Sequence, residues 1–284
     1  MIDIVVEGLD HPEGVAWGPD GFLYAGGEAG QIYRIDVDAR SYTQLCSTGG
    51  FSLGLALDAE SAVYVCDLTS SSVLRVTQDG AVSTYSSGSP ARPMVTPNYP
   101  VFDHQGNLYV SDSGQWSQGG GGCVYLVRPG GTTSVWSTQA SRFANGMALS
   151  RDGDYLYVVE SLLPGVIRIP ILGDGSAGVR EVVLELPESV PDGLAFTAEG
   201  TLLIACYRPD RIYALDSAGR LSVLADDPLG TDIAAPTNVA FGRADLRSLF
   251  IASLGRWHVA ELRLDSPGLR LHYPEAPVAL HGKQ

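Results

Sequence analysis

The chain has 284 residues, with 18 Lys or Arg against 32 Asp or Glu, which gives a formal net charge of −14. A nucleic-acid-binding surface needs a basic face to neutralise phosphates, and no run of Lys or Arg occurs, so that class of function is excluded. Apolar residues make up 45% and charged residues 18% of the chain, which excludes wholesale disorder.

The N-terminal segment and the cysteines bear on where the protein works. Acidic residues stand among residues 1–7, where a secretory signal would carry basic ones, and no stretch reaches 18 apolar residues. The four cysteines show no CxxC spacing, so we expect free thiols. We therefore expect a cytoplasmic protein without a membrane partner, either a monomer or a weak homodimer.

The predicted strands fall into six repeats, in a chain whose 34 Gly and 17 Pro indicate many tight turns. Each repeat has a small or polar residue, an apolar run, a polar turn and a second apolar run that begins near an aromatic residue. The second residues of the repeats are 40 to 47 positions apart. In chain order the repeats are 12–27, 52–67, 97–112, 144–160, 191–206 and 236–253.

A third apolar stretch follows in every repeat, and a fourth in most of them. Four short strands in each of six units predict an all-β fold, a six-bladed β-propeller with four antiparallel strands per blade. Two six-stranded sandwiches are the alternative. No linker divides the chain, so we expect residues 1–284 to form a single domain. Residues 2–7 and 269–273 are both candidates for the outer strand that closes the ring, and the sequence does not choose between them.

The first strand of each blade lines the central tunnel of a propeller, so residues at one register of these strands lie at one depth. Four of the six residues at the second position of the repeats carry a carboxylate or an amide, and the other two are Leu53 and Thr237. Asp and Asn also favour turns, which is the simpler explanation for any one of them. The four are Glu13, Asn98, Asn145 and Asp192, which we call the polar quartet.

Two carboxylates that face each other in a narrow tunnel repel and lose hydration unless a cation compensates them. The charges of Glu13 and Asp192 match one divalent cation, and the two amides add neutral oxygen ligands. Oxygen ligands without His or Cys favour a hard ion such as Ca²⁺, Mg²⁺ or Mn²⁺ over structural zinc. We therefore expect one divalent metal ion as cofactor, from among Ca²⁺, Mn²⁺, Mg²⁺, Zn²⁺ and Fe²⁺.

The motifs around the polar quartet resemble those of the gluconolactonase, regucalcin (senescence marker protein) and luciferin-regenerating-enzyme family. The resemblance covers nearly the whole chain, and the motifs stand in family order. It implies a six-bladed propeller with one divalent metal in the tunnel, often a sugar lactonase, with a phosphotriesterase relative. It also implies that Glu13, Asn145 and Asp192 are direct metal ligands and that Asn98 is a fourth ligand or a substrate contact. The motifs are HPEG (11–14), PN (97–98), ANGMALS (144–150) and PDGLAF (191–196).

Two positions depart from the family pattern. Members that resemble regucalcin have an Arg two residues before the motif Asn, where this chain has Thr96. Many members have Asp directly after that Asn, where this chain has Tyr99 followed by Pro100. These differences leave the expected metal site intact and count against a gluconolactone-type substrate.

The loops that join the second and third strands share the rim of the tunnel with the polar quartet. The longest of them, 112–122, reads DSGQWSQGGGG, and we consider both a lid that carries Trp116 over the site and a plain flexible hairpin. Arg208, on the corresponding loop of the fifth repeat, and Arg256, on that of the sixth, are the candidates to replace the missing Arg, and we take Arg208 first. Asn98, Trp116 and Arg208 are therefore the expected substrate-binding residues.

The leading functional hypothesis is a metal-dependent hydrolase that opens a small-molecule lactone. The metal would polarise the carbonyl group, and Asp192 would act as general base for the attacking water. The alternatives are a phosphotriesterase that uses the same site, a non-catalytic ligand-binding propeller, and a metal-free condensing enzyme similar to strictosidine synthase.

Overall fold

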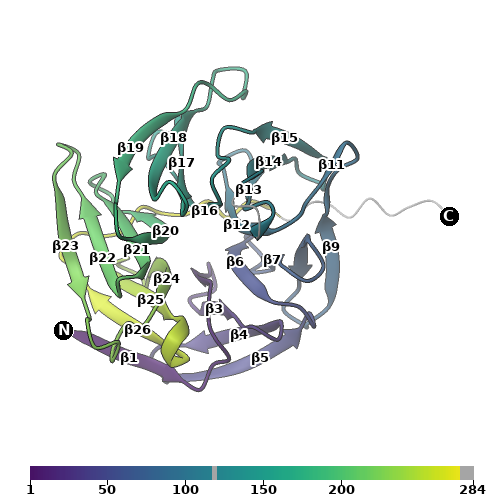
Figure 1. The fold of residues 1–284 in the computed structure, drawn as a ribbon. Coiled ribbons are helices and arrows are strands. Elements are labelled where there is room, and N and C mark those ends of the chain that lie inside the picture. Colours follow the sequence, from purple (N-terminus) through teal and green to yellow (C-terminus); the bar gives the residue numbers. More distant parts are fainter. Residues whose placement is uncertain (117–119, 276–284) are drawn as a thin grey trace.

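The computed structural model describes residues 1–116 and 120–275. Within these residues the chain forms six antiparallel sheets of four strands each, and Figure 1 shows the sheets arranged in a ring around a common centre. The prediction of an all-β, six-bladed propeller is confirmed. No helix in the described ranges is both long and apolar enough to cross a lipid bilayer.

In each of the first three blades, the strands follow one another along the chain from the centre of the ring outwards. Blade 1 consists of β2 (Val15–Trp17), β3 (Leu23–Gly26), β4 (Gln31–Asp36) and β5 (Ser41–Ser47). Blade 2 consists of β6 (Ser52–Leu57), β7 (Val63–Asp67), β8 (Ser72–Val76) and β9 (Val82–Ser86). Blade 3 consists of β12 (Pro97–Phe102), β13 (Leu108–Asp112), β14 (Cys123–Val127) and β15 (Thr133–Ser137). A small hairpin, β10 (Gly88–Ser89) and β11 (Arg92–Pro93), precedes blade 3.

The last three blades also run from the innermost strand to the outermost. Blade 4 consists of β16 (Ala144–Leu149), β17 (Tyr155–Glu160), β18 (Gly165–Pro170) and β19 (Glu181–Glu185). Blade 5 consists of β20 (Val190–Phe196), β21 (Leu202–Arg208), β22 (Arg211–Leu215) and β23 (Leu221–Asp226). Blade 6 consists of β24 (Pro236–Gly242), β25 (Ser248–Ser253), β26 (His258–Arg263) and β1 (Ile2–Glu7), and the 3-10 turn η2 (Leu254–Arg256) joins β25 to β26.

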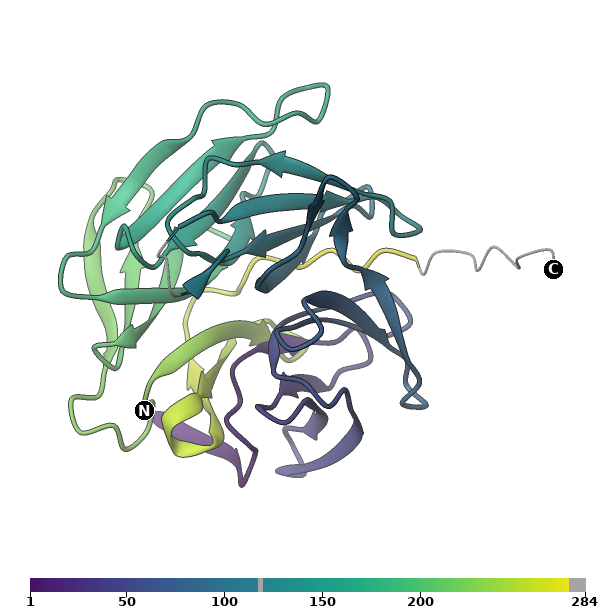
Figure 2. The ribbon, with the colours of Figure 1, turned by 45° about the vertical axis from the view of Figure 1, so that its right-hand side comes forward.

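The N-terminal strand β1 closes the ring. It pairs antiparallel with β26 as the outermost strand of blade 6, with Ile2 opposite Leu262 and Glu7 opposite His258. The C-terminal segment 269–273 has a different role, because it crosses the end of the tunnel opposite the polar quartet. Its Leu269 N–H donates to the Phe196 carbonyl at 2.8 Å, and the Tyr273 hydroxyl donates to the Trp17 carbonyl at 2.7 Å. Figure 1 shows this yellow segment passing behind the centre, and Figure 2 shows it running between the blades.

The core lies between neighbouring blades, because each sheet buries both of its faces. One cluster joins side chains of blade 1, such as Leu23 and Ile35, to side chains of blade 6, such as Phe250 and Val259. Apolar runs therefore outnumber alternating patterns in this sequence, as expected of sheets covered on both sides. All four cysteines are unpaired, as the sequence predicted.

Candidate functional site

The polar quartet lies where the inner strands begin, at the end of the tunnel that we call the mouth. Asn98, Asn145 and Asp192 belong to β12, β16 and β20, and Glu13 lies two residues before β2. All four side chains are buried, with 3 to 7% of their surface exposed. The inner strands contact one another in cyclic order, so the four side chains come from separate blades of one closed ring.

Bulges at the start of the inner strands help to aim the quartet. In five of the six inner strands the pairing register shifts across this position, as between Ala144 and Met147 in β16. A bulge leaves an extra residue out of the ladder and turns its side chain, and bulges are common next to active sites. Asn98, Asn145 and Asp192 each lie inside such a bulge.

Glycines allow the blades to approach closely at the level of the quartet. The residue after the quartet register is glycine in four of the six blades. A Cβ atom on Gly146 would lie 2.3 Å from the backbone oxygen of Asp192, and one on Gly14 would lie 2.4 Å from the backbone oxygen of Leu53. Only a residue without a Cβ fits there, so the glycines keep the mouth narrow and bring the quartet together.

One oxygen of every quartet member is buried without a hydrogen-bond partner. Within the described part of the chain this holds for Glu13 Oε2, Asn98 Oδ1, Asn145 Oδ1 and Asp192 Oδ1. Buried polar atoms are nearly always paired, so four such oxygens at one depth call for an explanation. Two carboxylate and two amide oxygens are the donor set that a hard divalent cation prefers. The residues present therefore fit a cation of this kind.

Two serines orient the asparagines of the quartet. Asn98 Nδ2 donates to the Ser113 hydroxyl at 3.1 Å, and that hydroxyl donates to the Ala144 carbonyl of the next blade at 2.7 Å. Asn145 and Ser161 repeat the arrangement, with distances of 3.2 Å and, to the Pro191 carbonyl, 2.9 Å. Because the NH₂ group of each amide donates to a serine, the Oδ1 atom of the same amide points away from that serine.

The two carboxylates are electrostatically strained when no cation is present. Burial, followed by repulsion from Asp192, raises the pKa of Glu13 well above its usual range, and the Asn238 amide opposes this shift. Burial also raises the pKa of Asp192 to about 7, against the opposing effect of the Asn145 amide. A positive charge at the mouth would relieve both shifts.

Sequence reasoning missed Ser113, Ser161 and Asn238. Asn238 is fully buried, and both of its amide atoms are unpartnered among the described residues. Asn238 stands at the position that is glycine in four of the blades. The presence of Asn instead of Gly there is the feature of the sequence that could have identified it. Its neighbour Thr237 donates its hydroxyl to the Glu13 carbonyl at 2.6 Å, so Thr237 fixes the backbone of Glu13.

The two rim residues that were expected to bind substrate both lie at the mouth. Trp116 has 52% of its surface exposed and packs against Phe143, with ring centroids 5.7 Å apart. The lid hypothesis also concerns residues 117–119, which lie outside the described residues. Arg208 forms an ion pair with Asp210 on its own loop and lies over the ring of Tyr207.

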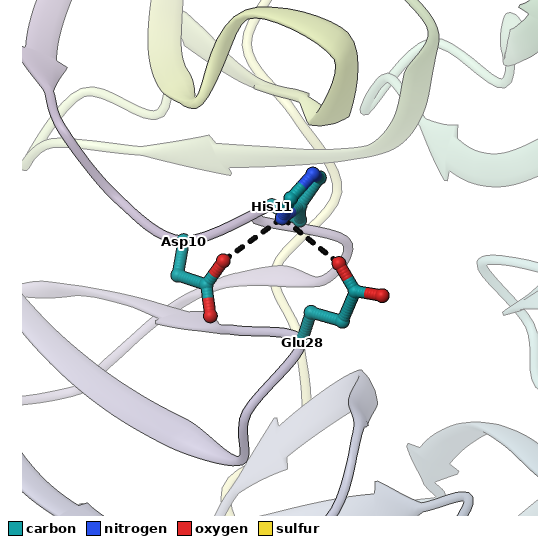
Figure 3. A group of neighbouring side chains, drawn as sticks. All are labelled: Asp10, His11 and Glu28. Atoms are coloured by element: carbon teal, nitrogen blue, oxygen red, sulfur yellow. Dashed lines mark hydrogen bonds and ion pairs between the residues drawn. The ribbon is translucent and has the colours of Figure 1, made fainter.

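A second group of ionisable side chains, which Figure 3 shows, includes His11, two residues before Glu13 in the chain. His11 Nδ1 lies 2.8 Å from a carboxylate oxygen of Asp10 and 2.9 Å from one of Glu28, and their donor atoms converge. The His11 ring packs against Trp257 at 4.6 Å between centroids. The imidazole is thus already paired with both carboxylates, and the group fixes the turn that leads into Glu13.

A cavity of about 180 Å³ lies at the opposite end of the tunnel, under the C-terminal segment 269–273. Its walls are mainly apolar and include Val15, Met147 and Leu194, each two residues after a quartet member. None of the quartet residues lines it. The cavity lacks the buried, unpartnered oxygens of the quartet, so we place the chemistry at the mouth.

Known proteins resemble this chain both in sequence and in fold. A 6-deoxy-6-sulfogluconolactonase from Pseudomonas putida is 32% identical over 127 residues, which cover 44% of this chain and 42% of that protein. A gluconolactonase from Xanthomonas campestris has the same fold, with a TM-score of 0.78 at 21% identity over 94% of this chain and 89% of its own. A calcium-binding protein, regucalcin, from Agrobacterium tumefaciens gives a TM-score of 0.79 at 16% identity, covering 96% of each chain.

Two family models match segments of the chain. The chain spans between 42% and 61% of the length of the first curated relatives that it matches. A model of strictosidine synthase-like N-terminal regions matches residues 3–35. The model described as the SMP-30/gluconolactonase/LRE-like region matches residues 82–255, more than half of the chain. The chain therefore belongs to the SMP-30/gluconolactonase/LRE-like family.

Proposed function

We propose that this protein is a lactonase that depends on one divalent cation held by the polar quartet. The observation that carries the proposal is the set of four buried, unpartnered oxygens, which come from four separate blades and include two carboxylates. Leaving such atoms unpaired costs free energy, which a fold retains when the atoms serve a ligand. Names of relatives support the reaction class, since one is a 6-deoxy-6-sulfogluconolactonase and another a gluconolactonase.

Glu13, Asn98, Asn145 and Asp192 would hold the cation. When bound, it would supply positive charge that polarises the carbonyl group of the lactone. The carboxylate and amide oxygens of the quartet are typical ligands of hard ions. One structural neighbour is described as a calcium-binding protein. Ca²⁺, Mn²⁺ and Mg²⁺ are thus the first ions to test.

Asp192 is the general base in this proposal. A carboxylate has two oxygens, so one can face the cation while the other accepts a proton. Asp192 takes a proton from the attacking water as the new C–O bond forms at the carbonyl carbon. The ring C–O bond then breaks, and Asp192 returns the proton to the leaving oxygen, which gives a hydroxy acid.

The remaining residues of the mouth either orient the quartet or contact the substrate. Ser113 and Ser161 keep the amide oxygens of Asn98 and Asn145 directed away from the serines. Asn98, Trp116 and Arg208 are the residues to which we assign contact with the lactone. For Arg208 this requires a substrate group that competes with its present partner, Asp210.

The test is a panel of lactones assayed with the purified protein before and after chelation. We expect hydrolysis that chelation abolishes and that added Ca²⁺, Mn²⁺ or Mg²⁺ restores. Glu13→Gln removes one charge from the quartet while keeping the side-chain shape. We expect added ions to restore much less turnover in this variant than in the wild-type protein. Turnover that survives complete removal of divalent ions, or no turnover of any lactone with the ions present, would contradict the proposal.

A further inference from the structure

The residues that lie immediately outside the polar quartet form a second layer at the mouth. They stand two positions before the quartet register, at the first residue of β20 and just before the other inner strands. Thr96 and Ala235 are buried, and the other four are partly or largely exposed. None of the six is Asp, Glu, Lys or Arg, and four are apolar. In blade order they are His11, Phe51, Thr96, Phe143, Val190 and Ala235.

Exposed aromatic side chains extend this layer outwards. Trp257, with 48% of its surface exposed, packs on His11, and the half-exposed Trp116 packs on Phe143. Both tryptophans are thereby anchored on residues two positions before a quartet member. In blade 5, Val190 is itself 39% exposed and stands in the same register. Apolar surface left open to water next to a site is a feature of ligand-binding regions.

Three carboxylates of the rim do not offer their oxygens to a ligand, because they bind the protein itself. They end the second strands of blades 2, 3 and 4 and are almost completely buried. They accept hydrogen bonds from backbone N–H groups of the rim loops, and Glu160 is also paired with Arg180. They are Asp67, Asp112 and Glu160.

We propose that the mouth selects lactones that carry an apolar substituent, alkyl or aryl, over polyhydroxylated sugar lactones. This inference rests on the proposed function. With the carbonyl group at the quartet, the substituent lies against the second layer and against Trp116 and Trp257. A sugar lactone would instead leave several of its hydroxyl groups facing the apolar side chains of the mouth, which cannot hydrogen-bond to them, and this lowers affinity.

The test is a series of γ-lactones with alkyl chains of zero to six carbons, compared with glucono-δ-lactone. Burial of a methylene can improve kcat/KM by up to about fourfold. We expect kcat/KM to rise along the series through a falling KM, and to exceed the value for glucono-δ-lactone. Equal or higher kcat/KM on glucono-δ-lactone would overturn the inference while leaving the lactonase proposal standing, whereas failure of every lactone would overturn both.

Variants locate the selectivity. Trp257→Ala should reduce the gain from the alkyl chain at least fivefold and leave kcat on the unsubstituted lactone within twofold. Trp116→Ala should reduce the same gain at least fivefold. Leu172→Ala is the control, because Leu172 is similarly exposed but lies on the hairpin between β18 and β19, at the other end of blade 4. Unchanged chain-length dependence in both tryptophan variants would overturn the inference.

Binding without turnover provides a second readout, which does not depend on catalysis. Tryptophan fluorescence is titrated with 2-pentylcyclopentanone and with cyclopentanone, which resemble the lactones but cannot be hydrolysed. We expect the pentyl compound to bind at least tenfold more tightly, and the difference to shrink in Trp257→Ala. Equal affinity of the wild-type protein for the two ketones would contradict an apolar subsite. This comparison does not depend on the variants, so it holds even if a tryptophan variant fails to fold.

Discussion

Single oxygen atoms define the candidate site at the residue scale. Each quartet member keeps one oxygen buried and unpartnered. Ser113 and Ser161 hold the amides of Asn98 and Asn145, and Thr237 holds the backbone of Glu13. Residues that hydrogen-bond to metal ligands and orient them typically matter almost as much for metal binding as the ligands themselves. The site is therefore larger than four residues, and its supporting residues can be tested separately.

Asp192→Asn separates proton transfer from folding. The variant keeps the shape of the side chain and removes a buried carboxylate whose pKa is raised to about 7, so we expect the cation-free protein to be at least as stable as wild type. Loss of the general base should lower kcat by about 10²- to 10⁴-fold. Circular dichroism and lactone turnover measure the two effects. Wild-type turnover in this variant would refute the role assigned to Asp192.

Asn238→Leu tests the residue that the sequence did not reveal. The Asn238 amide lies beside Glu13 and opposes the rise in the pKa of Glu13. We therefore expect Asn238 to support the charged form of Glu13, which binds a cation. Its loss should weaken Ca²⁺ affinity by about 10- to 100-fold. Asn107→Ala is the control, since Asn107 is a buried, hydrogen-bonded amide on the turn before β13. If both variants bind Ca²⁺ like wild type, Asn238 has no such role.

The sequence alone predicted the quartet because its members recur at one register of a repeat. Ser113 and Ser161 follow the second strands of their blades by one residue, and nothing in the spacing links them to Asn98 and Asn145. Asn238 was hidden because the repeat was aligned on Thr237, whose hydroxyl binds backbone. Contacts between blades join residues from separate repeats, and one sequence without the fold does not show them.

The inner strands decide the geometry of the site at the element scale. Bulges turn the side chains of Asn98, Asn145 and Asp192, and glycines at the next position in four blades let neighbouring strands approach closely. The pattern of strands was predictable from the repeats, whereas the closure of the ring was not. Residues 2–7 and 269–273 are similar apolar stretches, and only the pairing with β26 assigns β1 to blade 6.

Gly146→Ala tests whether close approach of the strands matters. The added Cβ would lie 2.3 Å from the Asp192 backbone oxygen, so β16 and β20 would have to separate. Overpacking of this kind costs about 1–3 kcal/mol. We expect a lower melting temperature and weaker Ca²⁺ binding. Gly173→Ala is the control, because a Cβ there meets nothing within 4 Å. Equal Ca²⁺ affinity in both variants would show that the approach is not needed.

The charge of the quartet should be visible in the stability of the whole molecule. A buried acid with a raised pKa keeps its proton in the folded state where the unfolded state has lost it, so its contribution to stability falls as pH rises. For Asp192 this range extends from its ordinary pKa of 3.8 to about 7.

We therefore expect the melting temperature of the cation-free protein, relative to that of Asp192→Asn, to decrease between pH 4 and pH 7. Saturating Ca²⁺ should remove the decrease, because the cation replaces the proton as partner of the carboxylates. Thermal unfolding of both proteins, with chelator and with Ca²⁺, measures this difference. A difference that is independent of pH would show that the Asp192 carboxylate is not under strain.

The proposed function depends on a cation held at the mouth by oxygens from separate blades. Calorimetric titration of chelator-stripped protein with Ca²⁺, Mn²⁺ and Mg²⁺ tests for it most directly. We expect saturable binding of one ion per chain for at least one of these metals, weakened at least a hundredfold in Glu13→Gln. Absence of binding for all three metals, or binding that Glu13→Gln leaves unchanged, would contradict it.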